Sequence, residues 1–112
     1  MANTFINKKV DLTTTSVTTL YTVPSASTAI IKSILVSEDS GNADTITITI
    51  TAGSDVFSLF KTKAIGANAT VELLSAPLVI EESEILKVTA ATANRLHVVL
   101  SALETKKRVV TT

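Results

Sequence analysis

The sequence has no cysteine and no tryptophan, and it has only one tyrosine, three phenylalanines, three glycines and two prolines. Without cysteine the chain cannot form a disulfide scaffold, a thiolate zinc site or a cysteine nucleophile. Three scattered glycines cannot build a glycine-rich phosphate-binding loop. Ten Lys and Arg balance ten Asp and Glu, and this net charge of zero argues against a broad basic surface for nucleic acid.

The residues that are abundant describe a folded chain. Hydrophobic residues make up 46% and charged residues 18% of the 112 positions, a composition that excludes a disordered chain. This length suits one domain, which we expect to span residues 1–112. The beginning of the chain lacks the apolar core of a signal peptide, and residues 17–31 are too rich in Thr and Ser to form a membrane helix. We therefore expect a soluble protein without membrane contact.

The sequence favours strands throughout. Thr occurs 19 times, and Thr, Val and Ile prefer extended backbone because their branched side chains are stiff. Apolar runs separated by turn residues predict nine strands, at residues 4–12, 16–22, 29–38, 44–51, 56–63, 70–74, 78–80, 85–89 and 96–104. We expect an all-β fold, a single antiparallel β-sandwich of about eight strands. The pattern leaves both a jelly-roll and an immunoglobulin-like topology open.

Side-chain alternation indicates where the core lies. In residues 45–51 three Ile alternate with four Thr, so the Ile row is expected to face the core and the Thr row solvent or a polar neighbour. Three other strands are apolar on both faces. A small sandwich has one core, so a second apolar face indicates contact with another subunit or assembly. The candidate assembly residues are Ile31, Leu35, Phe57, Leu59, Val99 and Leu103. The alternative is that some of them lie at strand ends or under loops.

Residues that could carry chemistry are few. His97 is the only histidine and has no second His or Cys with which to hold a metal, so we expect a structural role for it. Oxygen ligands at Asp39, Asn42 and Asp44 surround Gly41, but the EF-hand spacing is absent and a hairpin turn explains them. Glu81, Glu82 and Glu84 are typical of a solvated turn rather than of paired catalytic carboxylates. We expect no enzyme activity, no cofactor, no metal and no small-molecule substrate.

The last eight residues differ in character from the rest of the chain. Lys106, Lys107 and Arg108 are consecutive cations that precede a short apolar and polar end. Residues 105–112 are therefore a candidate extended arm that docks on an acidic neighbour or pairs with a strand of another chain. The alternative is a frayed, solvated terminus.

Several segments resemble small virion proteins of tailed bacteriophages, notably of the marine cyanophage type. The resemblance begins with Tyr21-Thr22-Val23-Pro24, a small-residue loop and an Ile-rich strand, which together span residues 20–34. It continues through residues 61–74, with Ile65-Gly66-Ala67-Asn68 at the turn, through residues 81–89 and through residues 93–101. The pattern has a Gly-Asp turn where this chain has Glu82-Ser83-Glu84. The likeness covers roughly residues 15–104.

The resemblance implies a non-enzymatic structural protein of a phage virion. Such proteins are β-sandwiches that decorate capsids or build head–tail and tail structures. The expected partners are other virion proteins of the capsid or tail together with further copies of the chain as a homo-oligomer. The expected location is the virion, after synthesis in the host cytoplasm. The alternative is a host-recognition module, glycan-binding or adhesin-like, whose loops at residues 39–44 and 65–68 carry the function.

Overall fold

A computed structural model describes residues 3–106, which form nine β-strands and no helix. The strands are β1 (Asn3–Asp11), β2 (Thr18–Thr22), β3 (Ser27–Glu38), β4 (Asp44–Ala52), β5 (Asp55–Ile65), β6 (Thr70–Glu72), β7 (Leu78–Ile80), β8 (Ile85–Ala90) and β9 (Leu96–Lys106). All nine expected strands are confirmed, with ends that differ by a few residues. None of the described residues belongs to a helix that could span a membrane.

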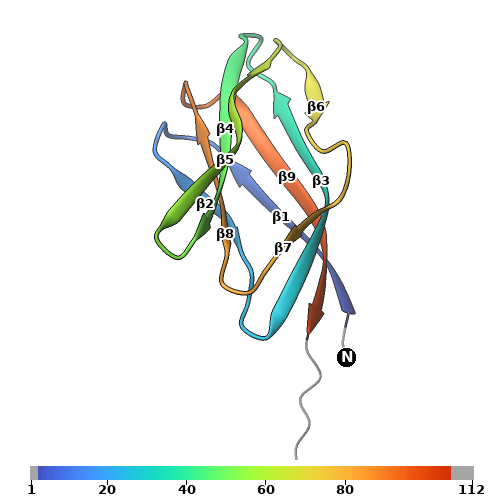
Figure 1. The fold of residues 1–112 in the computed structure, drawn as a ribbon. Helices are drawn as coiled ribbons and strands as arrows, with labels where there is room; N and C mark the ends of the chain where they lie inside the picture. Colours follow the sequence, from blue (N-terminus) through green and yellow to red (C-terminus); the bar gives the residue numbers. More distant parts are fainter. Residues whose placement is uncertain (1–2, 107–112) are drawn as a thin grey trace, which may run out of the picture.

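The strands form two antiparallel sheets that pack face to face (Figure 1). The five-stranded sheet has the order β1-β9-β3-β6, with β7 also paired to β3, and the four-stranded sheet has the order β2-β8-β4-β5. Apart from β7, the strands pair as nested partners: β1 with β9, β2 with β8, β3 with β6 and β4 with β5. This is one long antiparallel hairpin rolled into two layers, which defines a jelly-roll. The sequence left a jelly-roll and an immunoglobulin-like topology open, and the observed strand order is that of a jelly-roll.

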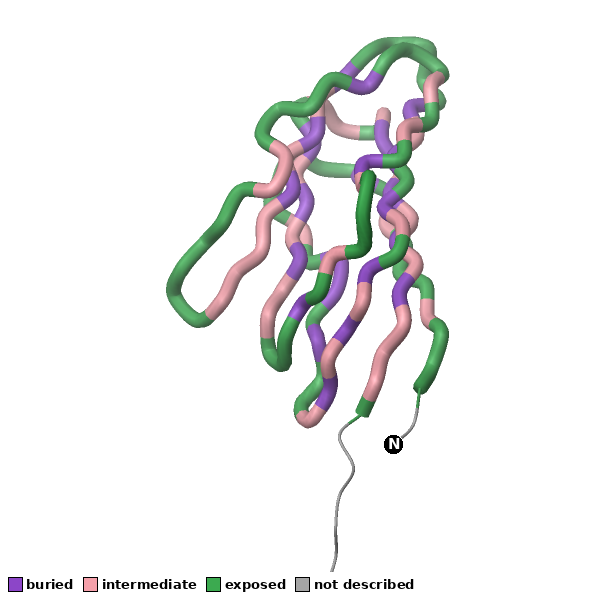
Figure 2. The backbone as a smooth tube through the Cα atoms, turned by 45° about the vertical axis from the view of Figure 1, so that its right-hand side comes forward, coloured by how far each residue is buried: buried purple, intermediate pink, exposed green. Residues whose placement is uncertain are grey.

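The core lies between the sheets and consists mainly of Ile, Leu and Val. Along the central strands, buried residues alternate with half-buried ones, as Figure 2 shows for the facing layers. Ile46 and Ile48 of β4 are fully buried and Ile50 is partly buried, while the Thr residues between them lie on the other face. The expected alternation of residues 45–51 is therefore confirmed.

A β-bulge in β3 changes the expected faces of that strand. Ile31 pairs with Ala102 and Ser33 pairs with Ser101, so Lys32 is an extra residue in the ladder. An extra residue reverses the alternation beyond it. Ile31 and Leu35 were both predicted as assembly residues, and regular alternation would place them on one face, but Ile31 is fully buried whereas Leu35 is exposed. Both Ile31 and Ile34 face the core as a result.

The loops at one end of the sandwich are joined by the carboxylate of Glu38, a side chain only 2% exposed. Its Oε1 accepts hydrogen bonds from the backbone N–H of Gly41 at 3.1 Å and of Asn68 at 2.9 Å, and its Oε2 accepts one from Ser40 N–H at 2.7 Å. Burial alone would raise the pKa of Glu38, but these bonds and one from the Ser40 hydroxyl stabilise the charged form and lower the pKa to about 2.

Two expectations about turns and termini are refined by the structure. Ser83 has a φ of 68°, so it adopts the left-handed conformation usually taken by glycine, at the turn where the resembling proteins carry Gly. Thr105 and Lys106 continue β9 and pair with β3, so they are not part of a separate arm. The remainder of the proposed arm, residues 107–112, lies outside the described residues.

Candidate assembly surface

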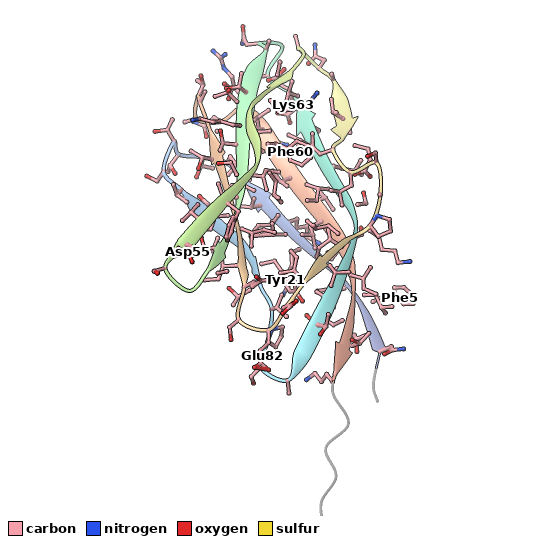
Figure 3. All side chains as sticks on the ribbon, viewed as in Figure 1. Phe5, Tyr21, Asp55, Phe60, Lys63 and Glu82 are labelled. Carbon is pink, nitrogen blue, oxygen red and sulfur yellow. The ribbon has the colours of Figure 1, made fainter. Side chains whose placement is uncertain are left out.

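The five-stranded sheet has an outer face that is turned away from the four-stranded sheet and is partly apolar. Residues directly opposite each other in neighbouring strands lie on the same face. One row of such partners runs across four strands: Phe5 pairs with Leu103, Leu103 with Ile30, and Ile30 with Val79. Phe5 is 80% exposed and projects away from the sandwich in Figure 3, and Val79 is 58% exposed. We call these four residues the apolar row.

A second row crosses the same face farther along the strands. Lys9 pairs with Val99, Val99 with Leu35, and Leu35 with Glu72. The two central members are apolar, while a cation stands at the β1 edge and an anion at the β6 edge. We call these four residues the charged-end row. It lies four residues from the apolar row along β9, a separation of about 13 Å in a strand.

A polar strip separates these two rows. Asn7 and Ser33 both pair with Ser101, and Lys32 projects here because the bulge leaves it unpaired. Beside the strip is a hollow of about 360 Å³ that is lined by Phe5, Ile6, Asn7, Lys32, Ser101 and Ala102.

The far end of the outer face carries a histidine between two carboxylates. His97 Nε2 lies 3.1 Å from Asp11 Oδ1, and His97 Nδ1 lies 3.5 Å from Asp39 Oδ2. The half-buried imidazole of β9 contacts one carboxylate from β1 and one from the loop after β3, so it links these three segments. A second hollow of about 240 Å³, lined by residues that include Lys9, His97 and Val99, lies beside it. The expected structural role of His97 agrees with this arrangement.

Glu72 both carries the charge at the β6 edge and supports the bulge. Its Oε2 accepts hydrogen bonds from the backbone N–H of Ile34 at 2.8 Å and of Leu74 at 3.2 Å, and Oε1 accepts one from the Ser33 hydroxyl. Burial alone would raise the pKa of Glu72, but these hydrogen bonds hold it below its usual value. The carboxylate is therefore negatively charged at neutral pH and fixed in position.

The structure separates the six residues predicted as an assembly surface. Leu35, Val99 and Leu103 lie on the outer face of the five-stranded sheet. Phe57 and Leu59 lie on β5 in the other sheet, where Phe57 is exposed and Leu59 packs against the core. The prediction for Ile31 is wrong, because Ile31 is fully buried in the core and the bulge at Lys32 separates its face from that of Leu35.

Three members of the apolar row were absent from the sequence prediction. Phe5 and Val79 lie on a terminal strand and on a three-residue strand, and regular alternation would place Ile30 on the same face as the buried Ile34. Alternation within one strand indicates which residues share a face, but it does not indicate which strands are neighbours. Only the pairing of β1, β9, β3 and β7 brings the four residues into one row.

The oxygen ligands around Gly41 do not gather into a metal site. Asp44 is buried and its Oδ2 accepts a hydrogen bond from Thr92 N–H at 3.0 Å, while Asp39 faces His97. Within residues 3–106 no group of three or more His, Cys, Asp or Glu side chains is arranged to hold a metal ion. A structural interpretation of this loop therefore fits the geometry.

The acidic turn is also structural in its contacts. Glu84 Oε1 accepts a hydrogen bond from Glu81 N–H at 2.7 Å, which closes the turn on itself. Glu82 Oε1 accepts one from Ala26 N–H, which ties this turn to the loop between β2 and β3. The carboxylates of Glu82 and Glu84 therefore bind backbone donors of two different turns.

The fold and this face define an antiparallel jelly-roll with a partly apolar, solvent-facing sheet. The solved structures to which the chain is similar include two crystal structures, both described as a pentameric capsid protein isolated from metagenomic phage sequences. One has a TM-score of 0.45 and 17% identity over 91% of this chain, and the other has a TM-score of 0.43 and 18% identity over 91%. The chain spans 61% and 62% of the lengths of those proteins.

The other comparisons gave no match. No protein-family model matches the chain. No curated protein matches it either.

Proposed function

We propose that this chain is a non-enzymatic structural protein of a phage virion and that it assembles through the outer face of its five-stranded sheet. The observation that carries the proposal is the apolar row, whose ends Phe5 and Val79 are exposed in one protomer while Leu103 and Ile30 between them are partly exposed. A single soluble domain seldom exposes a continuous apolar patch unless the patch binds something. The sequence resemblance to phage virion proteins supports the same function.

The jelly-roll fold is compatible with this role. Jelly-rolls occur both in viral capsid proteins and in lectins, so the fold by itself supports assembly and glycan recognition equally. The position of the surface favours assembly. The two hollows described above lie beside β1 and β9, on the broad side of the five-stranded sheet.

The second candidate function is host recognition by the loops at one end of the sandwich. Glu38 binds both Gly41 and Asn68, so the loops after β3 and β5 lie together. Arg95 Nη1 also donates a hydrogen bond to Ala43 O at 2.9 Å. A glycan array probed with the purified protein tests this candidate, and binding that is lost on changing loop residues would favour it over assembly.

Virion membership is tested on purified phage particles from a culture that produces the chain. Mass spectrometry with labelled reference peptides is expected to find the protein in the particles at a fixed copy number. A copy number in the hundreds would indicate capsid decoration, and about a dozen would indicate a neck ring. Particles that lack the protein would contradict the proposal.

A variant links virion membership to the outer face. Leu35→Lys places a charge on an exposed residue of that face and is expected to reduce incorporation into particles. Val56→Lys is the matched control, because Val56 is an exposed residue of β5 in the other sheet. Equal incorporation of both variants would contradict a role for the outer face.

A further inference from the structure

We propose that the outer face of the five-stranded sheet binds a second copy of this chain face to face, about a twofold axis that runs parallel to the strands between β9 and β3. The inference rests on the proposed function and specifies the partner and geometry of that surface. Aligned sheets pack about 10 Å apart with strand directions within about 30° of each other. The two rows on this face determine how the copies fit.

A twofold axis along the strands places the apolar row on its own copy. The rotation exchanges β1 with the β6 and β7 edge and exchanges β9 with β3, while each row stays at the same height along the strands. Phe5 then lies over Val79 of the partner subunit, and Leu103 lies over Ile30 of the partner subunit. Apolar side chains that are exposed in the single protomer are thereby removed from water.

The same rotation pairs the opposite charges of the charged-end row. Lys9 at the β1 edge lies over Glu72 of the partner subunit, and the second such pair follows by symmetry. A twofold axis across the strands would instead place Phe5 over Lys9 of the partner subunit and Val79 over Glu72 of the partner subunit. Apolar groups would then cover charges, so the pattern on the face favours the axis along the strands.

The polar strip at the middle accommodates the remaining cation. Lys32 projects from β3 and lies, after the rotation, near Asn7 and Ser101 of the partner subunit, whose side chains offer oxygen acceptors. The hollow of about 360 Å³ next to Asn7 and Ser101 provides space for the lysine. The centre of the interface is therefore polar, and the lysine side chain can fill the space there. The apolar row lies on one side of this centre and the charged-end row on the other.

The size of the face is sufficient for a stable dimer. The sheet is four strands wide at a spacing of about 4.8 Å, and its strand positions average about 9.5 residues because β6 and β7 together fill one edge, which gives a flat area of about 600 Å². Side chains enlarge this area, and a standard interface buries about 800 Å² per partner. The face can therefore supply a whole interface.

Sedimentation velocity over a range of protein concentrations, together with a charge reversal, tests the dimer. Lys9→Glu is expected to raise the dimer dissociation constant by about tenfold or more, because it places two carboxylates opposite each other at both ends of the row. Lys8→Glu is the matched control, since Lys8 pairs with Leu100 and lies on the opposite face of the same strand. It is expected to change the constant by less than about twofold.

A second pair of variants tests the apolar row. Val79→Asp is expected to weaken the dimer strongly, whereas Val56→Asp, an equally exposed site in the other sheet, is expected to leave it intact. Thermal unfolding of each variant checks that the fold is retained. Both valines are exposed in the protomer, so neither change opens the core.

Zero-length cross-linking identifies the geometry directly. A water-soluble carbodiimide joins a lysine to a carboxylate in contact with it, and it is expected to link Lys9 to Glu72. Within one chain these residues stand at opposite edges of the sheet, separated by β9 and β3 and thus by about 14 Å, so a zero-length link between them must join two copies.

Each result of these experiments either supports or contradicts the proposed dimer. A protein that stays monomeric up to millimolar concentration, a ring larger than a dimer, or equal effects of Lys9→Glu and Lys8→Glu would overturn it. The proposed function fails separately. A monomer that is found in particles contradicts only the dimer, and a dimer of the stated geometry that is absent from particles contradicts only the virion role.

Discussion

Among single residues, Glu38 has the clearest structural task, because one carboxylate satisfies backbone donors in two loops that are distant in sequence. Carboxylates that accept several backbone N–H bonds favour their charged form. Its folded pKa of about 2 is below the ordinary value of 4.5. The charged form therefore stabilises the fold at pH values above 4.5, and this contribution disappears as the pH falls toward 2.

Glu38→Gln is expected to lower the midpoint of thermal unfolding at pH 7, because an amide has only one acceptor oxygen where the carboxylate has two. The difference from the parent protein is expected to shrink as the pH falls from 4.5 to 2. Differential scanning calorimetry across that range measures it. Glu81→Gln, at an exposed position, is the control, and a difference that does not vary with pH would contradict the assignment.

Tyr21 is a second residue whose environment predicts a measurement. Its side chain is buried, and its hydroxyl donates a hydrogen bond to Glu104 Oε2 at 2.7 Å. Burial first, and then the bond to the Glu104 carboxylate and its negative charge, raise the pKa of Tyr21 above its usual value of 10. The neutral phenol therefore stabilises the fold below pH 10, and this contribution is lost as the pH rises further.

Ultraviolet titration is expected to show ionisation of Tyr21 only at a pH above 10, together with unfolding. Because Tyr21 is the only tyrosine and the chain lacks tryptophan, the signal belongs to one group. Tyr21→Phe is expected to cost about 1 kcal/mol of unfolding free energy at pH 7, measured by denaturant unfolding. Ionisation at the ordinary pKa without unfolding would contradict the hydrogen-bonded, buried phenol.

At the scale of elements, alternation identified the strands but not their irregularities. The predicted Ile and Thr pattern of residues 45–51 is correct in the structure because regular strands repeat every two residues, and β9 alternates in the same way. The bulge at Lys32 leaves no comparable pattern in the sequence, because it depends on the register with β9 and on Glu72 as an acceptor for Ile34 N–H. For this reason Ile31 was placed on the wrong face.

The turn between β3 and β4 offers an element-scale prediction. Gly41 has a φ of 82°, and its N–H binds Glu38, so Gly41→Ala is expected to cost about 1 kcal/mol of stability. Gly66→Ala is the control, because its φ is not positive and an added Cβ would lie 3.7 Å from Ala69 Cβ, an ordinary contact. Its expected effect is within about 0.5 kcal/mol. Urea unfolding measures both, and equal losses would contradict the assigned strain.

For the whole molecule, the nested pairing makes almost every ladder long-range. Asn3 pairs with Thr105, so the two ends of the described chain lie side by side in one sheet (Figure 1). Closing such distant pairs costs chain entropy before any contact is gained. The topology therefore determines how fast the chain can fold.

Refolding from denaturant is expected to take milliseconds to seconds, as for other all-β domains with non-local contacts. Stopped-flow fluorescence of Tyr21 measures the rate, since this residue is buried in the native state. A variant without residues 3–11 loses the longest-range ladder and exposes β9, so it is expected to be much less stable. Folding in microseconds would be inconsistent with the pairing described.

The amino-acid pattern alone was enough for the positions of the strands, the sandwich class and the presence of apolar residues on two faces. These properties depend on the backbone preference of each residue type and on the two-residue alternation of side chains in a strand. Both can be predicted from the sequence alone. The jelly-roll order, the inward turn of Ile31 and the row from Phe5 to Val79 depend on which distant strands are neighbours. Pairing is settled by packing across the whole domain, so only the tertiary structure could bring the residues of the candidate assembly surface together.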